Sequence, residues 1–158
     1  MIAIGCSGHQ FLPTEAALVA AAAIDELLAG LNGDVTGICS LADGTDQIFA
    51  ARVLERGFRL QAILPCHEYE DTFVEEDSRA SFLELLAMAD HCETLDFQAC
   101  SEEAYLAAGQ RVVDLTELVV VVWDGEVARG VGGTADIVDY AKAKGRELLI
   151  VWPDNVVR

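Results

Sequence analysis

The sequence predicts one α/β domain with a three-layer, doubly wound and mostly parallel sheet of the Rossmann-like kind. Short apolar segments alternate with helical segments along the whole chain, which is typical of α/β proteins. The apolar segments lack alternating polar positions, as expected of parallel strands that are covered on both faces. The 158 residues, of which 53% are hydrophobic, can fill one core and are too few for two ordinary domains. We therefore expect a single domain over residues 1–158.

The first half of the chain contains three predicted strands separated by helices. Pro13 and Thr14 provide start signals for a helix that ends near Gly30. A second helix carries apolar residues at helical spacing and ends at Gly57. In chain order, the predicted elements are a strand at 2–6, a helix from 14 to about 29, a strand at 35–39, a helix at 48–54 and a strand at 60–64.

The second half contains a less regular segment followed by the strongest strand of the chain. Between residues 67 and 109 the periodicity weakens, and residues 68–77 are strongly acidic. Residues 118–123 are apolar throughout and are expected to form a central strand. The predicted elements are a helix around 82–89, a weak strand at 94–97, a helix at 102–115, a strand at 118–123, a helix at 134–144 and a strand at 148–152.

Charge and composition narrow the expected partners. The formal net charge of -17 argues against nucleic acid, since phosphate backbones are held by many basic side chains. A single small phosphorylated ligand remains compatible, because backbone amides at a helix N-terminus can bind it. The N-terminal residues lack the pattern of a secretory signal, and no apolar segment is long enough to span a bilayer. We expect a cytoplasmic protein that binds neither nucleic acid nor a membrane.

The five cysteines do not predict a disulfide framework or a metal site. Their number is odd and their spacing irregular, so we interpret them as small buried hydrophobic residues. Cys66, His67 and Glu68 are consecutive, and an extended chain points neighbouring side chains in alternating directions. We expect no metal, and a nucleotide or another phosphorylated small molecule as the ligand.

Open parallel sheets bind ligands beyond the carboxyl ends of their strands, where the strand order reverses. In the most informative of these positions, the adjacent Gly132 and Gly133 allow close backbone approach, and Thr134 can cap the following helix. The free amides there predict a phosphate site, although the same glycines would also serve a simple turn. Four segments meet the rule, namely 5–9, 40–46, 64–67 and 123–134.

The turns after the first two strands are further candidates. Ser7 and Gly8 follow the first strand, and Gly44 and Thr45 precede a helix, but tight turns explain both pairs equally well. Asp46, in the first turn of that helix, could contact a ligand or only favour the helix dipole.

Basic and titratable side chains accompany these turns. His9 and His67 lie in predicted strand-end loops, from which either could reach a ligand. Arg129, in the glycine loop, is better placed to pair with a phosphate than Arg79 or Arg111. A solvated or salt-bridged surface position is the more common outcome for each arginine.

Taken together, these segments resemble the SLOG superfamily of Rossmann-like domains, which includes the LOG phosphoribohydrolases, DprA and predicted nucleotide sensors. The resemblance covers most of the chain and rests on the order and spacing of its motifs relative to the strands. The second motif is most similar to that of sensor-type members, whereas Gln10 departs from them, since Arg often follows the first-turn His there. The motifs are Gly5-Cys6-Ser7-Gly8-His9, Ser40-Leu41-Ala42-Asp43-Gly44-Thr45-Asp46, Val122-Trp123-Asp124-Gly125 and Gly132-Gly133-Thr134-Ala135-Asp136.

The resemblance implies a nucleotide or nucleotide-derived ligand and a homodimer. The phosphate would lie on the amides of Gly132, Gly133 and Thr134, with the ribose and base across Ser7, Gly8 and the second turn. The expected ligand-binding residues are Gly5, Ser7, Gly8, His9, Ser40, Ala42, Gly44, Thr45, Asp46, Pro65, Trp123, Asp124, Arg129, Gly132, Gly133, Thr134 and Asp136.

Three functions remain open at this point. The first is a nucleotide-binding sensor or regulatory module without strong catalysis, the second an N-glycosidase like LOG or the deoxyribosyltransferases, and the third a ligand-free partner-binding domain. In those enzymes the working carboxylate stands three residues after the Gly-Thr threonine, and here that position is Ile137. Asp136 and Asp46 remain as alternative acids. We therefore expect the first function.

Overall fold

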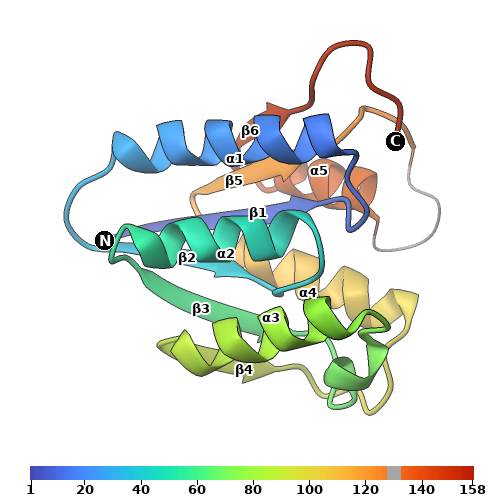
Figure 1. Ribbon diagram of the computed structural model, residues 1–158. Helices are drawn as coiled ribbons and strands as arrows, with labels where there is room; N and C mark the ends of the chain where they lie inside the picture. The colour runs from blue at the N-terminus through green and yellow to red at the C-terminus, as the bar shows by residue number, and fades with distance from the viewer. Residues whose placement is uncertain (128–132) are drawn as a thin grey trace.

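The computed structural model describes residues 1–127 and 133–158, and these form a three-layer α/β fold (Figure 1). Every strand pairing in its six-stranded sheet is parallel, and the strand order is β4-β3-β2-β1-β5-β6. The predicted fold class is confirmed. The strands are β1 (Ile2–Gly8), β2 (Val35–Cys39), β3 (Arg59–Leu64), β4 (His91–Thr94), β5 (Leu118–Val122) and β6 (Glu147–Val151).

Helices cover both faces of the sheet. Figure 1 shows helices in front of the sheet and behind it, as the parallel crossovers require. The front helices are α1 (Thr14–Ala29), α2 (Thr45–Glu55) and α3 (Glu76–Met88), and those behind are α4 (Glu102–Asp114) and α5 (Thr134–Ala143). A short 3₁₀ helix, η1 (Tyr69–Thr72), lies between β3 and α3 and was not predicted.

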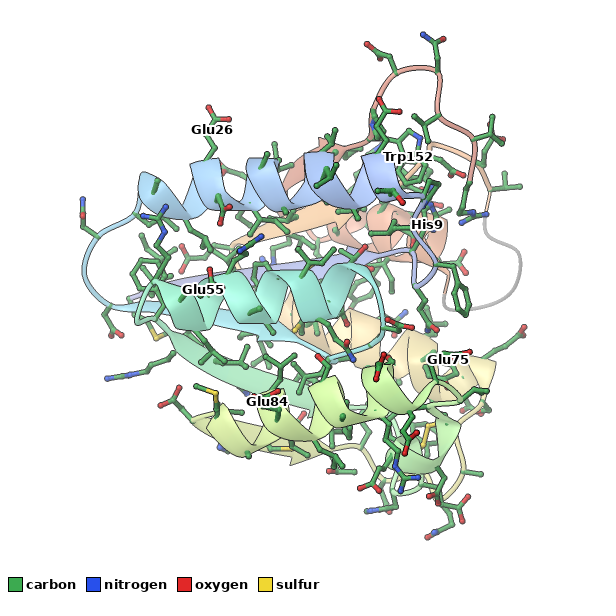
Figure 2. All side chains as sticks on the ribbon, in the orientation of Figure 1. His9, Glu26, Glu55, Glu75, Glu84 and Trp152 are labelled. Atoms are coloured by element: carbon green, nitrogen blue, oxygen red, sulfur yellow. A yellow bond between two sulfur atoms is a disulfide. The ribbon has the colours of Figure 1, made fainter. Side chains whose placement is uncertain are left out.

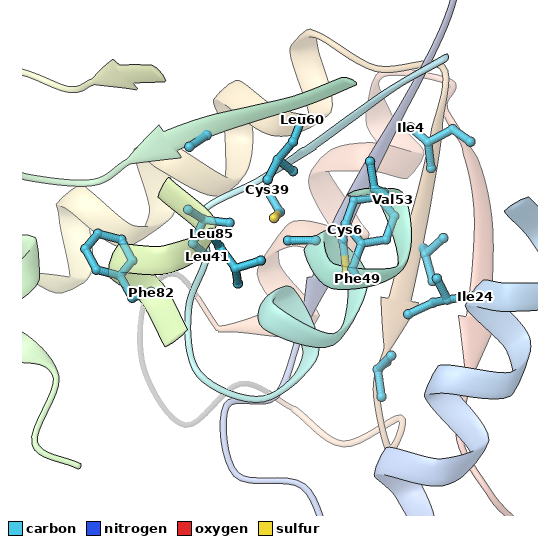
Figure 3. Close-up of a cluster of buried hydrophobic side chains, with 14 of the residues drawn as sticks. Ile4, Cys6, Ile24, Cys39, Leu41, Phe49, Val53, Leu60, Phe82 and Leu85 are labelled. Carbon is cyan, nitrogen blue, oxygen red and sulfur yellow. The ribbon is translucent and has the colours of Figure 1, made fainter. Parts of the chain in front are cut away.

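The apolar core fills both spaces between the sheet and its helices. Between the sheet and the front helices, Ile24 of α1 and Phe49 of α2 pack with Phe82 of α3 in one buried cluster (Figure 3). Behind the sheet, Val119 and Val121 of β5 pack against Ile137 of α5. Strand β5 is therefore buried on both faces, which explains why its sequence is apolar throughout.

The segment with weak periodicity, residues 67–109, contains the one strand whose position differs clearly from the prediction. The weak strand predicted at 94–97 lies at His91–Thr94, as β4 at the edge of the sheet. Its first two side chains, His91 and Cys92, are exposed. An edge strand has a neighbour on one side only and buries little, so its sequence carries a weak apolar signal.

The cysteines differ from the expectation in part. Cys66 and Cys100 form a disulfide that links the end of β3 to the loop before α4, with their Cα atoms 5.2 Å apart. Cys92 is exposed, whereas Cys6 and Cys39 are buried free thiols. Cys66 is buried as expected, but the expectation of free cysteines is wrong for Cys66 and Cys100, because the fold brings together two segments that are distant in sequence. The expectation of burial is wrong for Cys92, which lies on the edge strand β4.

None of the helices in residues 1–127 and 133–158 combines the length and the apolar character that crossing a membrane requires.

Candidate functional site

The sheet has its topological switch point between β1 and β5. From β1 the chain adds β2, β3 and β4 on one side and then crosses back to add β5 and β6 on the other. Beyond the carboxyl ends of these strands lies a cavity of about 370 Å³. A crevice at this position is the usual ligand site of open α/β sheets.

Ten of the expected ligand-binding residues line this cavity together. They come from all four of the predicted segments, so the fold brings those segments to one place. These residues are Ser7, Gly8, His9, Ser40, Ala42, Asp46, Pro65, Trp123, Gly133 and Thr134. Their role in binding remains a prediction.

Among the described residues, five other expected positions are not part of the cavity wall. Gly5 faces helix α4, since a Cβ there would lie 2.7 Å from Cγ1 of Val112. The other four are Gly44, Thr45, Asp124 and Asp136. Arg129 and Gly132 lie outside the described residues, so the structure does not place them.

Two small residues allow the first and second turns to touch. Gly8 packs against Thr45, and a Cβ at Gly8 would lie 2.8 Å from Cβ of Thr45. The Thr45 hydroxyl donates a hydrogen bond to the His9 carbonyl over 3.0 Å. Gly44 has a φ of +78°, and a side chain there would collide with the Gln10 carbonyl. These contacts hold the loop after β1 against the start of α2 and so shape one wall of the cavity.

His9 is the centre of a buried polar cluster at the end of β1. Its Nε2 accepts a hydrogen bond from the Asp124 backbone N–H over 3.3 Å and lies 3.3 Å from Oδ1 of Asp124. Its Nδ1 lies 3.5 Å from the Thr134 hydroxyl, and its ring meets Trp152 edge-to-face with centroids 5.5 Å apart. Figure 2 shows His9 and Trp152 side by side. The imidazole therefore joins β1, β5 and the start of α5.

Arg158 adds a cation to this cluster. Its Nη1 lies 2.5 Å from Nδ1 and 3.1 Å from Nε2 of His9, and its Nε lies 3.4 Å from Oδ2 of Asp124. Burial alone would raise the pKa of Asp124, but the Glu126 backbone N–H, His9 and Arg158 together hold it below its ordinary value. The cavity therefore has a basic side chain beside the N-terminus of α5, where an anion is favoured.

Asp46 supplies a buried carboxyl on the opposite wall. Its side chain lies at the start of α2, and its Oδ2 accepts hydrogen bonds from the backbone N–H groups of Ser40 and Ala42 over 3.2 and 3.3 Å. Burial raises its pKa to about 7, against the lowering effect of these two hydrogen bonds. Near neutral pH this carboxyl can therefore hold or release a proton at the cavity wall.

The resemblance to the LOG enzymes would place their catalytic carboxylate at position 137, which is isoleucine in this chain. Ile137 lines the cavity and packs against Gly109 of α4, where a Cβ would collide with it. The Ile137 side chain is aliphatic, so it can pack against its neighbours but cannot act as a catalytic acid or nucleophile.

Several cavity residues were not found by sequence reasoning. Tyr69 and Tyr105 line the wall from η1 and α4, and Arg158 reaches it from beyond β6. The sequence pattern places Tyr105 on the apolar face of its predicted helix. Nothing in the local sequence links Tyr69 or Arg158 to a site at the end of β1. His67, which we considered able to reach a ligand, does not line the cavity. Its Nε2 lies 3.6 Å from Oδ1 of Asp96, and its side chain is about half exposed.

Metal ligation has no support in the described part of the chain. No group of three His, Cys, Asp or Glu side chains lies close enough there to hold an ion. Cys66, a residue of the only metal candidate we considered in the sequence, is bonded to Cys100.

Comparisons with known proteins show a shared fold. DprA from Streptococcus pneumoniae superposes with a TM-score of 0.73 at 16% identity over 98% of this chain, and this chain spans 52% of that protein. DprA from Helicobacter pylori gives 0.69 at 14% identity over 98% of this chain and 67% of its own. This chain has the DprA-like Rossmann fold. The molybdenum cofactor carrier protein of Chlamydomonas reinhardtii gives 0.54 at 14% identity over 94% of this chain and 75% of its own.

Sequence comparisons add nothing to this result. No protein-family model matches the chain, and no curated protein matches it.

The exclusion of nucleic acid on the basis of net charge is wrong. The H. pylori DprA structure describes a single-stranded DNA binding mode, and that protein shares the fold over 98% of this chain. The net charge of -17 is a sum over the whole chain, whereas a strand contacts one local surface. The net charge of the whole chain is therefore not a valid ground for excluding a nucleic-acid partner.

Proposed function

We propose that this protein binds a nucleotide or nucleotide-derived phosphorylated ligand in the cavity at the ends of β1 and β5, and acts as a sensor or regulatory module. The observation that carries the proposal is the meeting of Arg158, His9 and Thr134 at the N-terminus of α5 in a cavity at the switch point. The first amides of a helix have no acceptor within the helix, so they are available to an anion.

The ligand's phosphate would lie on the amides at Gly133 and Thr134, with Arg158 as its charged partner. Asp124 holds Arg158 before the ligand arrives, since its carboxylate lies 3.4 Å from the guanidinium. A phosphate carries more charge than a carboxylate and can take several of these donors at once. The ribose would then face Ser7 and Asp46 across the cavity.

Gly133→Val tests this placement. Gly133 has φ -70° and ψ 171°, which a side chain tolerates, so the variant should fold. We expect the valine to block the amides and to weaken binding of ribose 5-phosphate and adenosine monophosphate at least tenfold in calorimetry. Gly30→Val, at the C-cap of α1, is the matched control and should bind as the parent does. Equal affinity of Gly133→Val and the parent would show that the phosphate site is elsewhere.

Single-stranded nucleic acid is a second candidate ligand, favoured by the fold shared with H. pylori DprA. In this case one nucleotide unit of the strand would occupy the same cavity. The test is a gel shift and calorimetry with an unstructured oligonucleotide of about 8 nucleotides. Binding that Gly133→Val removes together with mononucleotide binding assigns the strand to this cavity, whereas binding that this variant leaves intact places the strand on another surface.

A further inference from the structure

A second cavity, of about 290 Å³, adjoins the first one on the side of η1 and α3. The two cavities share four wall residues, which are Gln10, Ala42, Tyr69 and Tyr105. These four residues therefore form the boundary between the two cavities.

The second cavity has aromatic walls. Tyr69 and Phe73 meet edge-to-face with centroids 5.2 Å apart, and Phe73 stacks on Phe82 of the core at 4.6 Å. Phe11, in the loop after β1, also lines the cavity but is 77% exposed. A large exposed aromatic ring at the mouth of a cavity is well placed to cover a flat ligand ring.

The charge of the second cavity is opposite to that of the anion site. Asp43 and Glu75 line it, and its wall includes neither Lys nor Arg among the described residues. Glu75 precedes α3 without capping it through its side chain, so its carboxylate is not used by the helix end. Figure 2 shows Glu75 at the N-terminal end of α3. A phosphate is repelled here, whereas a ring that donates hydrogen bonds from amino groups is favoured.

Resting on the proposed function, we infer that the second cavity is a base subsite, which takes the amino-bearing heteroaromatic ring of a ligand whose phosphate lies in the first cavity. Phe11 and Phe73 contact the faces and edge of the ring, and Glu75 and Asp43 accept its amino hydrogens. The subsite therefore prefers adenine or cytosine to hypoxanthine or uracil, which have a carbonyl where the amino group would be.

Calorimetry with paired ligands tests this assignment. We expect adenosine monophosphate to bind about tenfold more tightly than inosine monophosphate, and cytidine monophosphate similarly more tightly than uridine monophosphate. Phe11→Ala should weaken all four by about tenfold, because stacking on the ring is lost. Glu75→Gln should reduce the preference for the amino-bearing bases. Both residues are exposed, so neither variant should disturb folding.

Matched controls and a truncated ligand keep this inference separate from the proposed function. Leu18→Ala removes an exposed apolar side chain from α1, and Glu84→Gln removes a carboxylate from the same helix that Glu75 precedes; both should bind as the parent does. Ribose 5-phosphate lacks a base, so its affinity should be unchanged by Phe11→Ala and Glu75→Gln.

Binding of ribose 5-phosphate distinguishes a failure of the base subsite from a failure of the proposed function. If ribose 5-phosphate binds but Phe11→Ala and Glu75→Gln leave the affinities of all four nucleotides unchanged, the base subsite is wrong and the phosphate site stands. If neither ribose 5-phosphate nor any nucleotide binds, the proposed function itself fails. An oligodeoxyadenylate of about 8 nucleotides that binds where the mononucleotides do not, and that Phe11→Ala weakens, assigns the subsite to the base of a strand.

Discussion

Replacing Asp46 with asparagine should make the protein more stable, and by an amount that depends on pH. Asp46 is 8% exposed as a residue, and one of its carboxyl oxygens accepts two backbone hydrogen bonds. An asparagine oxygen can accept the same two hydrogen bonds without carrying a charge. The Asp46→Asn variant therefore removes the cost of burying the ionised group while keeping the turn that precedes α2.

The magnitude follows from the pKa of Asp46, which burial raises from 3.8 to about 7. Because the folded state holds this proton more tightly than the unfolded chain does, the carboxyl lowers stability as pH rises above 3.8, and the loss is complete above about pH 7. At about 1.4 kcal/mol per pKa unit, the raised pKa costs about 4 kcal/mol at pH 8, where the folded carboxyl is ionised. At pH 5 it costs about 2 kcal/mol, because the carboxyl is protonated in the folded state and ionised in the unfolded chain. Asp46→Asn should regain these amounts.

Urea unfolding at pH 5 and pH 8 measures this difference. We expect the free energy of unfolding of Asp46→Asn to exceed that of the parent at both values, by about 2 kcal/mol more at pH 8 than at pH 5. Asp43→Asn, in the same turn, controls for the general effect of removing a negative charge from an acidic protein. A gain for Asp46→Asn that is the same at both pH values, or that Asp43→Asn reproduces, would refute the reasoning.

Three further predictions concern the disulfide, the second turn and catalysis. Replacing both Cys66 and Cys100 with serine should lower the free energy of unfolding of the oxidised protein by about 3 to 4 kcal/mol, because the disulfide closes a long loop. The argument fails if a dithiol reductant does not lower the stability of the parent protein in urea. Gly44→Ala should lower the free energy of unfolding by more than about 2 kcal/mol, measured by thermal unfolding, since φ is positive and the Gln10 carbonyl blocks the new Cβ. Gly33 has a similar φ with open space around it, so Gly33→Ala should lower this free energy by about 1 kcal/mol. Similar losses at the two positions would exclude the contact with Gln10 as the cause. Chromatography after long incubation should find no free base released from nucleoside monophosphates, because the resemblance to the LOG enzymes would place the catalytic acid at position 137, where this chain has isoleucine. Release that scales with protein concentration and disappears in Asp136→Asn would identify a hydrolase.

Much of the candidate site could be predicted from the sequence because it depends on local patterns. Residues 35–39 were predicted as a strand with the bounds that the structure shows, since every buried parallel strand leaves a short apolar run. The carboxyl ends of parallel strands meet at one edge of the sheet. Ser7, Ser40 and Trp123 could therefore be expected in one place, and they line one cavity.

The sequence by itself determined the alternation of strands and helices, the edge of the sheet at which polar turns gather, and the apolar residue at position 137. Only the tertiary structure decided that Arg158 reaches His9, that Cys66 pairs with Cys100, and that η1 contributes Tyr69 to both cavities. Arg158 is far from His9 along the chain, so no local pattern of either segment encodes their contact. Periodicity records which face of an element is buried, whereas pairing between distant side chains depends on how the elements pack together.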